Sequence, residues 1–92
     1  MNYKVLYHHK IPEDLREISS ETKKRIKSAI ENKLMTFPEK YGIPLRKNLK
    51  GFWKLRVGDY RIVFKINRAE KEIYILAILH RRKVYEIAKK RI

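Results

Sequence analysis

Three basic residues, Lys54, Arg56 and Arg61, are the side chains of this sequence best suited to chemistry on an anion. They lie in two apolar-rich runs that flank the dipeptide Gly58-Asp59. Because glycine accepts a positive φ, this dipeptide predicts a two-residue turn and therefore a β-hairpin. Side chains alternate along a strand, so the three cations should share one face of that hairpin.

The turn also fixes which residues of the hairpin lie opposite each other. The predicted pairs are Val57 with Tyr60, Arg56 with Arg61, Leu55 with Ile62, Lys54 with Val63, and Trp53 with Phe64. One face is apolar and should belong to the core, whereas the other face carries the cations. Two arginines directly opposite each other repel, which costs stability. This face is therefore a candidate binding surface, with an ordinary solvated face of an edge strand as the alternative.

The net charge of the chain supports a polyanionic partner. The 92 residues include 24 Lys and Arg against 10 Asp and Glu, a formal charge of +14. Residues 44–92 hold fifteen basic and four acidic side chains, whereas residues 1–43 hold nine and six. Such a field attracts nucleic acid or an acidic protein. An anionic membrane is disfavoured, because no basic stretch has a strongly apolar opposite face.

Several classes of function find no support in the sequence. The absence of cysteine excludes disulfides and thiolate zinc sites. The pair His8-His9 has no third ligand nearby, so we interpret both as surface histidines and expect no metal and no cofactor. No paired carboxylates, glycine-rich phosphate loop or Ser-His-Asp set is present. Without an apolar run of membrane-spanning length or a signal peptide, we expect a cytoplasmic protein with a single domain over residues 1–92.

The first half of the chain predicts a strand and two helices. Residues 3–7 are rich in β-branched and aromatic side chains and predict a strand. Pro12 suits the first turn of a short helix. Ser20 is the expected N-cap of a longer helix whose apolar stripe runs to Phe37. Residues 39–44 should form a connector, and the basic residues 45–50 either a loop or a short strand.

The second half predicts two further elements after the hairpin. Residues 72–79 are apolar on both faces, which is typical of an interior strand. A final helix follows, with Val84, Ile87 and Ala88 as its core stripe. Tyr85 lies about 100° from Val84 around the helix, so it should lean toward the cationic face.

These elements predict an α+β fold. We expect a mostly antiparallel sheet of about four strands, a helical hairpin packed on one face, and a C-terminal helix. If the helices cover one face only, the open face displays Lys54, Arg56 and Arg61.

Two stretches of the sequence resemble a known superfamily. The run LKGFWKLRVGDYRIVF (residues 49–64), followed by HRRKVY (residues 80–85), is similar to toxins of the RelE/ParE superfamily of toxin–antitoxin systems. Chain length, element order and basic charge agree over nearly the whole chain, and the RelE-type branch is favoured. The resemblance implies a RelE-like fold and, for the RelE branch, cleavage of messenger RNA in the ribosomal A site. The ParE branch instead inhibits DNA gyrase and lacks nuclease activity.

The resemblance also implies a set of site residues. RelE-type toxins use basic residues and a tyrosine at positions that correspond here to Lys54, Arg61, Arg81 and Tyr85, which we expect to be catalytic. Phe52 stands where the best-known RelE-type pattern has a second lysine. We expect four further basic side chains to bind RNA: Arg56, Lys47, Lys50 and Arg82.

The expected chemistry is RNA cleavage without a metal ion, by attack of a 2′-hydroxyl on the adjacent phosphate. Arg61 and Arg81 suit the phosphate, since a guanidinium binds two oxygens at once. Repulsion from neighbouring cations should let Lys54 exchange a proton. Tyr85 should orient the substrate by stacking on a base. His80 could act as a general base, although a structural role is favoured.

The resemblance further implies a cognate antitoxin. Its segment over the basic face should be acidic, and the toxin should be a monomer within a toxin–antitoxin hetero-oligomer. The other partner would be mRNA on the ribosome. Two alternatives stay open at this point: a ParE-like gyrase inhibitor, and an RNA-binding module without catalysis.

Overall fold

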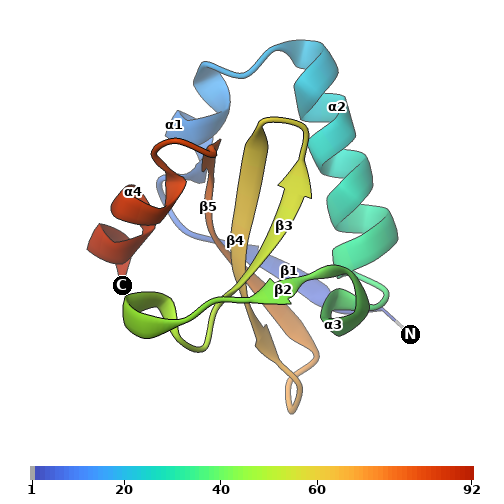
Figure 1. Ribbon diagram of the computed structural model, residues 1–92. Coiled ribbons are helices and arrows are strands. Elements are labelled where there is room, and N and C mark those ends of the chain that lie inside the picture. Colours follow the sequence, from blue (N-terminus) through green and yellow to red (C-terminus); the bar gives the residue numbers. More distant parts are fainter. Residues whose placement is uncertain (1) are drawn as a thin grey trace.

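The computed structural model describes residues 2–92, and within them one sheet is covered by helices on both faces (Figure 1). The strand order is β1-β5-β4-β3-β2, with β1 parallel to β5 and every other neighbouring pair antiparallel. The strands are β1 (Lys4–Tyr7), β2 (Ile43–Pro44), β3 (Trp53–Val57), β4 (Tyr60–Asn67) and β5 (Glu72–His80). The helices are α1 (Ile11–Arg16), α2 (Ser20–Ala29), which continues as a π-helix (Ile30–Leu34), α3 (Pro38–Tyr41), a 3-10 turn (Lys47–Leu49) and α4 (Val84–Arg91).

The predicted α+β class, mostly antiparallel sheet, helical hairpin and C-terminal helix are confirmed. The strand count is five rather than four, because the predicted connector contains α3 and the two-residue strand β2. So short a strand leaves no alternation in the sequence, and its Pro44 is compatible only with an edge position. The basic stretch 45–50 forms a 3-10 turn, not a strand.

All five predicted cross-strand pairs of the hairpin are present between β3 and β4. Gly58 has a φ of 60°, whereas Asp59 is not among the residues with positive φ. A positive φ at the first loop position alone is the pattern of a type II′ turn, for which glycine is preferred. The turn chemistry therefore sets the register that puts Lys54, Arg56 and Arg61 on one face.

Two hydrophobic clusters lie on opposite faces of the sheet. The first packs α1 and α2 against β3, β4 and β5 through residues that include Ile26, Leu34, Ile62, Phe64 and Ile75. The second packs α4 against the other face through Val63, Leu76, Ala77, Val84 and Ala88. The expectation that helices would cover only one face is therefore wrong. Val63 lies on the same face of the hairpin as the cations, and α4 packs over it and buries it completely.

A β-bulge in β5 explains how both faces of this strand become apolar. Val63 pairs with Ala77 while Phe64 pairs with Ile75, so Leu76 is the extra residue. The bulge shifts the alternation, and both Leu76 and Ala77 join the cluster under α4.

Smaller differences concern single residues. The N-cap of α2 is Ser19, whose Oγ accepts a hydrogen bond from the Thr22 N–H at 3.1 Å, rather than Ser20. Phe37, predicted to end the apolar stripe, is 62% exposed because the helix has ended before it. His8 is buried, contrary to the prediction, and its Nδ1 accepts the Lys10 N–H at 3.1 Å.

Candidate anion-binding site

The side chains of Lys54 and Tyr85 meet between β3 and α4. The Lys54 Nζ atom lies 5.8 Å from the centroid of the Tyr85 ring, within the range of a cation–π interaction. Val84 and Ala88 anchor α4 in the core, so the following residue, Tyr85, projects from the flank of the helix. Two residues 31 positions apart in the sequence are thereby brought together, as the motif resemblance implied.

A cavity of about 330 Å³ opens beside this pair. Its lining contains four basic residues and no acidic one. The lining residues are Leu45, Arg46, Lys47, Asn48, Leu49, Lys54, Tyr85 and Lys89. The arrangement provides positive charge next to an aromatic ring, which suits a phosphate attached to a base.

Lys47 reaches this cavity from an unusual backbone conformation. Its φ is 56°, in the left-handed region that non-glycine residues rarely adopt. It begins the 3-10 turn that lines the cavity. Strain of this kind persists only where surrounding contacts hold it, and it concentrates at functional sites.

Arg61 lies under the turn of the hairpin. It is only 8% exposed, and its Nη1 donates to the carbonyl oxygens of Gly58 at 3.0 Å and Tyr60 at 2.9 Å. It lies one diagonal step from Lys54, roughly 7–8 Å across the strand pair. Carbonyl groups hold this guanidinium in place without neutralising its charge.

Arg81 follows the end of β5 and lies beside the same turn. Its backbone N–H donates to the Asp59 carbonyl at 2.8 Å. Its side chain is exposed, and its Nε is 3.9 Å from the Asp59 carboxylate. An exposed pair at that distance binds weakly, so an incoming anion can replace Asp59.

The four side chains predicted to bind RNA lie at different places on the molecule. Lys47 lines the cavity with Lys54 and Tyr85, whereas Arg56 lines a different hollow toward α2. Arg82 lines a hollow beside α1 that also contains Asp14. Lys50 is exposed on the loop after the 3-10 turn and lines none of these hollows.

Sequence reasoning missed three polar residues of the cavity: Arg46, Asn48 and Lys89. Lys89 was accessible from the sequence, because it lies one helical turn after Tyr85 and shares its face. The other two depend on the fold of the 3-10 turn. At the position that departs from the RelE-type pattern, Lys65 Nζ lies 5.8 Å from the centroid of the Phe52 ring, so β4 supplies a cation there.

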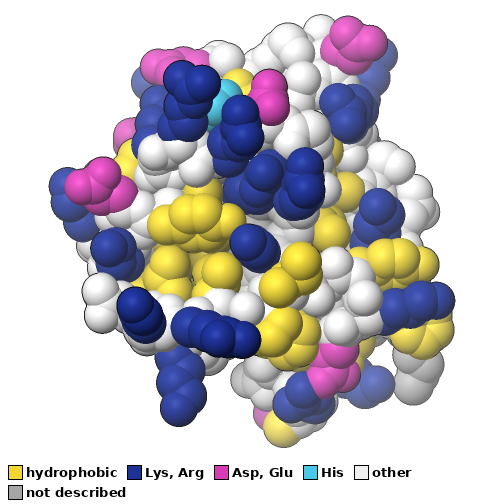
Figure 2. Space-filling view, viewed as in Figure 1, with side chains coloured by type: hydrophobic (Ala, Val, Ile, Leu, Met, Phe, Trp, Pro, Cys, Tyr) yellow, Lys and Arg dark blue, Asp and Glu magenta, His cyan; other side chains and the backbone are white. Residues whose placement is uncertain are grey.

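The surface view shows the same distribution. In Figure 2, Lys and Arg side chains gather over the β3–β4 hairpin, between α4 and α2, and surround hydrophobic side chains on this face.

His80 has a structural environment. Its Nδ1 accepts the Arg82 backbone N–H at 3.2 Å, and its ring meets the Tyr60 ring edge-on at 5.7 Å between centroids. These contacts support the structural interpretation of His80 over the general-base one.

A buried ion pair fixes α4 and hence Tyr85. Arg91 donates to both oxygens of Asp14, from Nη2 to Oδ1 at 2.7 Å and from Nη1 to Oδ2 at 2.8 Å. The same groups also bind the edge of β5 beyond β1, where Oδ2 accepts the Ile78 N–H and Nη1 donates to the Leu76 carbonyl. The hydrogen bond to Asp14 raises the pKa of Arg91 above its usual range.

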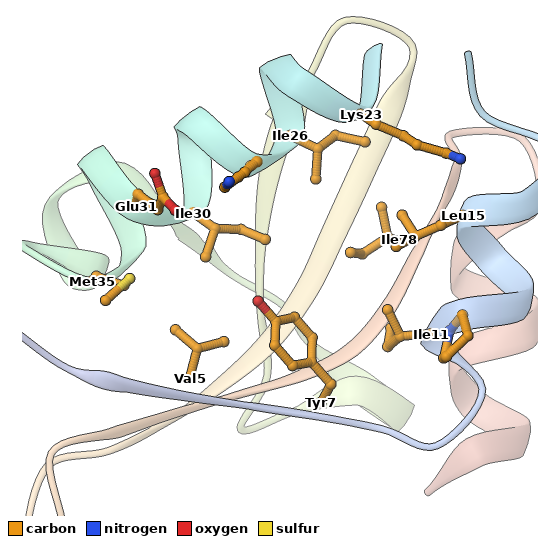
Figure 3. A pocket seen from close by; sticks show the side chains of 12 residues that line it. Val5, Tyr7, Ile11, Leu15, Lys23, Ile26, Ile30, Glu31, Met35 and Ile78 are labelled. Carbon is orange, nitrogen blue, oxygen red and sulfur yellow. The ribbon is translucent and has the colours of Figure 1, made fainter. Parts of the chain in front are cut away.

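An apolar cavity lies on the opposite face of the sheet, between β1, α1 and α2, and has a volume of about 790 Å³. Figure 3 shows Val5, Tyr7 and Ile11 on one side of it and Ile26 and Ile30 on the other. Burial, and secondarily the charge of Glu31, raises the pKa of the Tyr7 hydroxyl. This cavity lacks the concentration of cations that marks the α4 side.

Two further observations bear on function. Within residues 2–92, no cluster of three His, Cys, Asp or Glu side chains could hold a metal ion. None of the helices in that range has both the length and the apolar character required to span a bilayer.

Comparison with known proteins identifies the family. Residues 5–85 match the family described as the ParE toxin of type II toxin-antitoxin system, parDE. Toxin RelE3 of Methanocaldococcus jannaschii is 31% identical over 86 residues, which cover 90% of this chain and 96% of the relative. Toxin RelE of Mycobacterium tuberculosis is 35% identical over 54 residues, 59% of this chain, and that match spans only 56% of the relative.

Solved structures share the fold. A chain of the toxin–antitoxin complex RelBE2 from M. tuberculosis has a TM-score of 0.81 and 26% identity, over 88% of this chain and 93% of that one. A double mutant of the E. coli toxin RelE in the free state has a TM-score of 0.75 and 21% identity, over 100% of this chain and 99% of that one, a likeness in fold. From the family match, the RelE relatives and the shared fold, this chain belongs to the RelE/ParE superfamily of type II toxin–antitoxin toxins, in its RelE-type branch.

Proposed function

We propose that this toxin is a ribosome-dependent endoribonuclease that cleaves mRNA without a metal ion. The observation that supports it most directly is the Lys54 ammonium over the Tyr85 ring, at a cavity lined by four cations. Its similarity to RelE toxins favours the same activity. Since the ribosome is the site of action, the toxin would work in the cytoplasm.

The proposed reaction is an in-line displacement at phosphorus. The 2′-oxygen bonds to phosphorus as the bond to the 5′-oxygen breaks, which leaves a 2′,3′-cyclic phosphate and a 5′-hydroxyl. The proton of the 2′-hydroxyl passes to solvent water, and the Lys54 ammonium gives a proton to the departing 5′-oxygen. Arg81 and the charge of Arg61 stabilise the developing negative charge on the phosphate. Tyr85 stacks on a base and orients it.

The antitoxin, in this proposal, covers the hairpin with an acidic segment and forms a hetero-oligomer with a single toxin chain. Relatives of known structure, such as RelBE2, occur as toxin–antitoxin complexes. Charge complementarity acts mainly on the association rate. Replacing Lys54, Arg56 and Arg61 should therefore slow antitoxin association, and an unchanged rate would count against electrostatic capture.

The direct test is induction of the toxin in cells, followed by primer extension on a translated mRNA. New 5′ ends within the translated region are expected for the parent and not for Lys54→Gln or Tyr85→Ala. Lys71→Gln is a matched control, because Lys71 Nζ lies 5.3 Å from the Tyr3 ring and forms the same kind of pair at the other end of β5. Intact mRNA in cells whose growth the parent has arrested would reject the nuclease.

A gyrase inhibitor is the second candidate, and the match to the ParE family model favours it. It predicts DNA breaks that depend on gyrase, intact mRNA, and growth arrest that survives Lys54→Gln. Measuring mRNA ends and DNA breaks in the same induced culture separates the two functions.

A further inference from the structure

A second cationic hollow lies between α2 and the end of β3 and has a volume of about 480 Å³. Four basic residues, Lys24, Arg25, Lys33 and Arg56, line it together with Ser28 and Asn32. No acidic residue belongs to its lining. It is separate from the Lys54–Tyr85 cavity, which is lined by an entirely different set of residues.

The helical period of α2 divides its cations between two sides. Lys24 and Arg25 line the cationic hollow, whereas Lys23 and Lys27 line the apolar cavity on the other flank. All four side chains are exposed. The basic run of α2 therefore faces two sides of the helix, and half of it is directed at the hairpin.

The guanidinium of Arg25 lies close to the hairpin turn at Gly58. A Cβ atom at Gly58 would lie 3.2 Å from Arg25 Nη1, tighter than ordinary contact. The glycine that the turn needs for its positive φ also leaves room for this guanidinium. Arg25 and Arg56 thus approach the same hollow from α2 and β3.

Within residues 2–92, none of the cations that line the hollow forms an ion pair. Among residues 2–92, the ion pairs within 4.0 Å are Arg68–Glu39, Arg81–Asp59 and Arg91–Asp14, and none includes a cation of the hollow. Lys33 lies over the Tyr41 ring at 5.6 Å, which leaves Lys24, Arg25 and Arg56 facing the open space. Like charges held together in this way favour a bound anion, which relieves their repulsion.

We propose that this hollow binds a backbone phosphate of the RNA, at a distance from the cleavage site. Arg56 and Lys54 are two residues apart on the same face of β3, roughly 6.8 Å along the strand. A single RNA strand that runs along β3 therefore meets the hollow with one phosphate and the Lys54–Tyr85 cavity with another. The choice of RNA rests on the proposed function, whereas an acidic peptide is the competing ligand that the experiment tests.

The test measures binding without cleavage. A fluorescent 2′-O-methylated oligoribonucleotide of about 12 nucleotides cannot cyclise, and its affinity is followed by anisotropy over a series of KCl concentrations. We expect Lys24→Gln/Arg25→Gln to weaken binding about 10-fold at low salt and to reduce the salt slope by about 1–2. The matched control Lys23→Gln/Lys27→Gln removes the same charge from the same helix and should weaken binding less than about 3-fold. Thermal unfolding checks that both variants are folded.

Equal losses of affinity in the two double variants would overturn the proposal, because net charge alone would then explain binding. If Lys24→Gln/Arg25→Gln loses binding to a polyglutamate peptide but binds RNA as the parent does, the proposal is overturned in favour of an acidic protein. The outcome is independent of the nuclease assay. Weak RNA binding by Lys24→Gln/Arg25→Gln supports the phosphate site even if the parent cuts no mRNA, and parental affinity of that variant rejects the site even if the parent cuts.

Discussion

The side chains of Arg61 and Arg91 are largely shielded from solvent, and they are bound in opposite ways. Arg91 donates to both oxygens of a carboxylate that is itself only 3% exposed, so its charge is neutralised within the protein. Arg61 donates to two carbonyl oxygens of its own turn and has no carboxylate within 4.0 Å among the described residues. The first arginine joins α1 to α4, whereas the second keeps a positive charge beneath the hairpin turn that no carboxylate neutralises.

The two arginines should contribute differently to stability and to anion binding. A buried pair such as Asp14–Arg91 stabilises the fold only while both partners are present. A guanidinium held by carbonyls contributes less to stability, and its charge remains available to an external anion. The residues that hold the site in shape and the residues that supply its charge are therefore different, although all of them are basic or acidic.

The largest effect is expected at the neutralised arginine. Asp14→Ala leaves Arg91 buried without a counter-charge and frees the Ile78 N–H, so unfolding free energy should fall by about 3–5 kcal/mol. Urea unfolding followed by circular dichroism measures it. Glu13→Ala, one residue away and exposed, is the control and should change stability little. If Asp14→Ala lowers the free energy of unfolding by less than about 1 kcal/mol, the ion pair does not hold α4 in place.

At the second arginine, activity should fall more than stability. Arg61→Met keeps the length of the side chain and removes the charge, so we expect a loss of about 1 kcal/mol in stability and at least a 100-fold loss of mRNA cleavage. Unfolding curves and primer extension on the same preparation give the two numbers. If stability collapses while the folded fraction still cuts normally, Arg61 belongs with Arg91 as a structural residue.

Variants of Lys47 test whether backbone strain beside the Lys54–Tyr85 cavity costs stability. Lys47→Gly relieves the left-handed φ of 56° and should raise stability by roughly 0.5–1 kcal/mol after the entropic cost of glycine. The same change removes an ammonium from the cavity and should weaken RNA binding. Lys47→Ala retains the strain and loses the same charge, so it should bind RNA as weakly without the gain in stability.

The smallest expected effect is a pH dependence of stability that arises from His8, which is influenced by the charge of Arg91. Burial lowers the pKa of His8, and the positive charges of His9 and Arg91 lower it further, only partly offset by Asp14. The unfolded chain therefore binds a proton that the folded chain does not, and stability should decline as pH falls below about 6.5. His8→Asn keeps an acceptor for the Lys10 N–H and should flatten this decline. An unchanged slope in the variant would assign the pH dependence to other groups.

Local signals in the sequence predicted the hairpin well and its surroundings less well. Gly58-Asp59 determines the turn, and the turn determines the register, so the shared face of Lys54, Arg56 and Arg61 follows. The position of α4 over Val63 does not follow, because nothing in the hairpin indicates which element covers an isolated valine. Tyr85 was correctly placed near the cationic face only because the helix period places it on the flank of the core stripe.

Long-range contacts account for most of what the sequence did not reveal. The partnership of Asp14 with Arg91 joins residues 77 positions apart, and no local pattern in the sequence indicates it. The 3-10 turn that brings Arg46 and Lys47 to the cavity has no periodic pattern. Arg82 and Arg81 are neighbours in sequence, yet the turn after β5 sends them to different hollows or surfaces, which composition cannot predict.

The parallel pairing of β1 with β5 has a consequence for the timing of synthesis. Residues 4–7 pair only with residues 72–75, so a chain emerging N-terminus first carries an unpaired strand until the fifth has followed. Tyr85 and Arg91 are made later still. The cavity between Lys54 and Tyr85 is therefore incomplete until α4 has been translated.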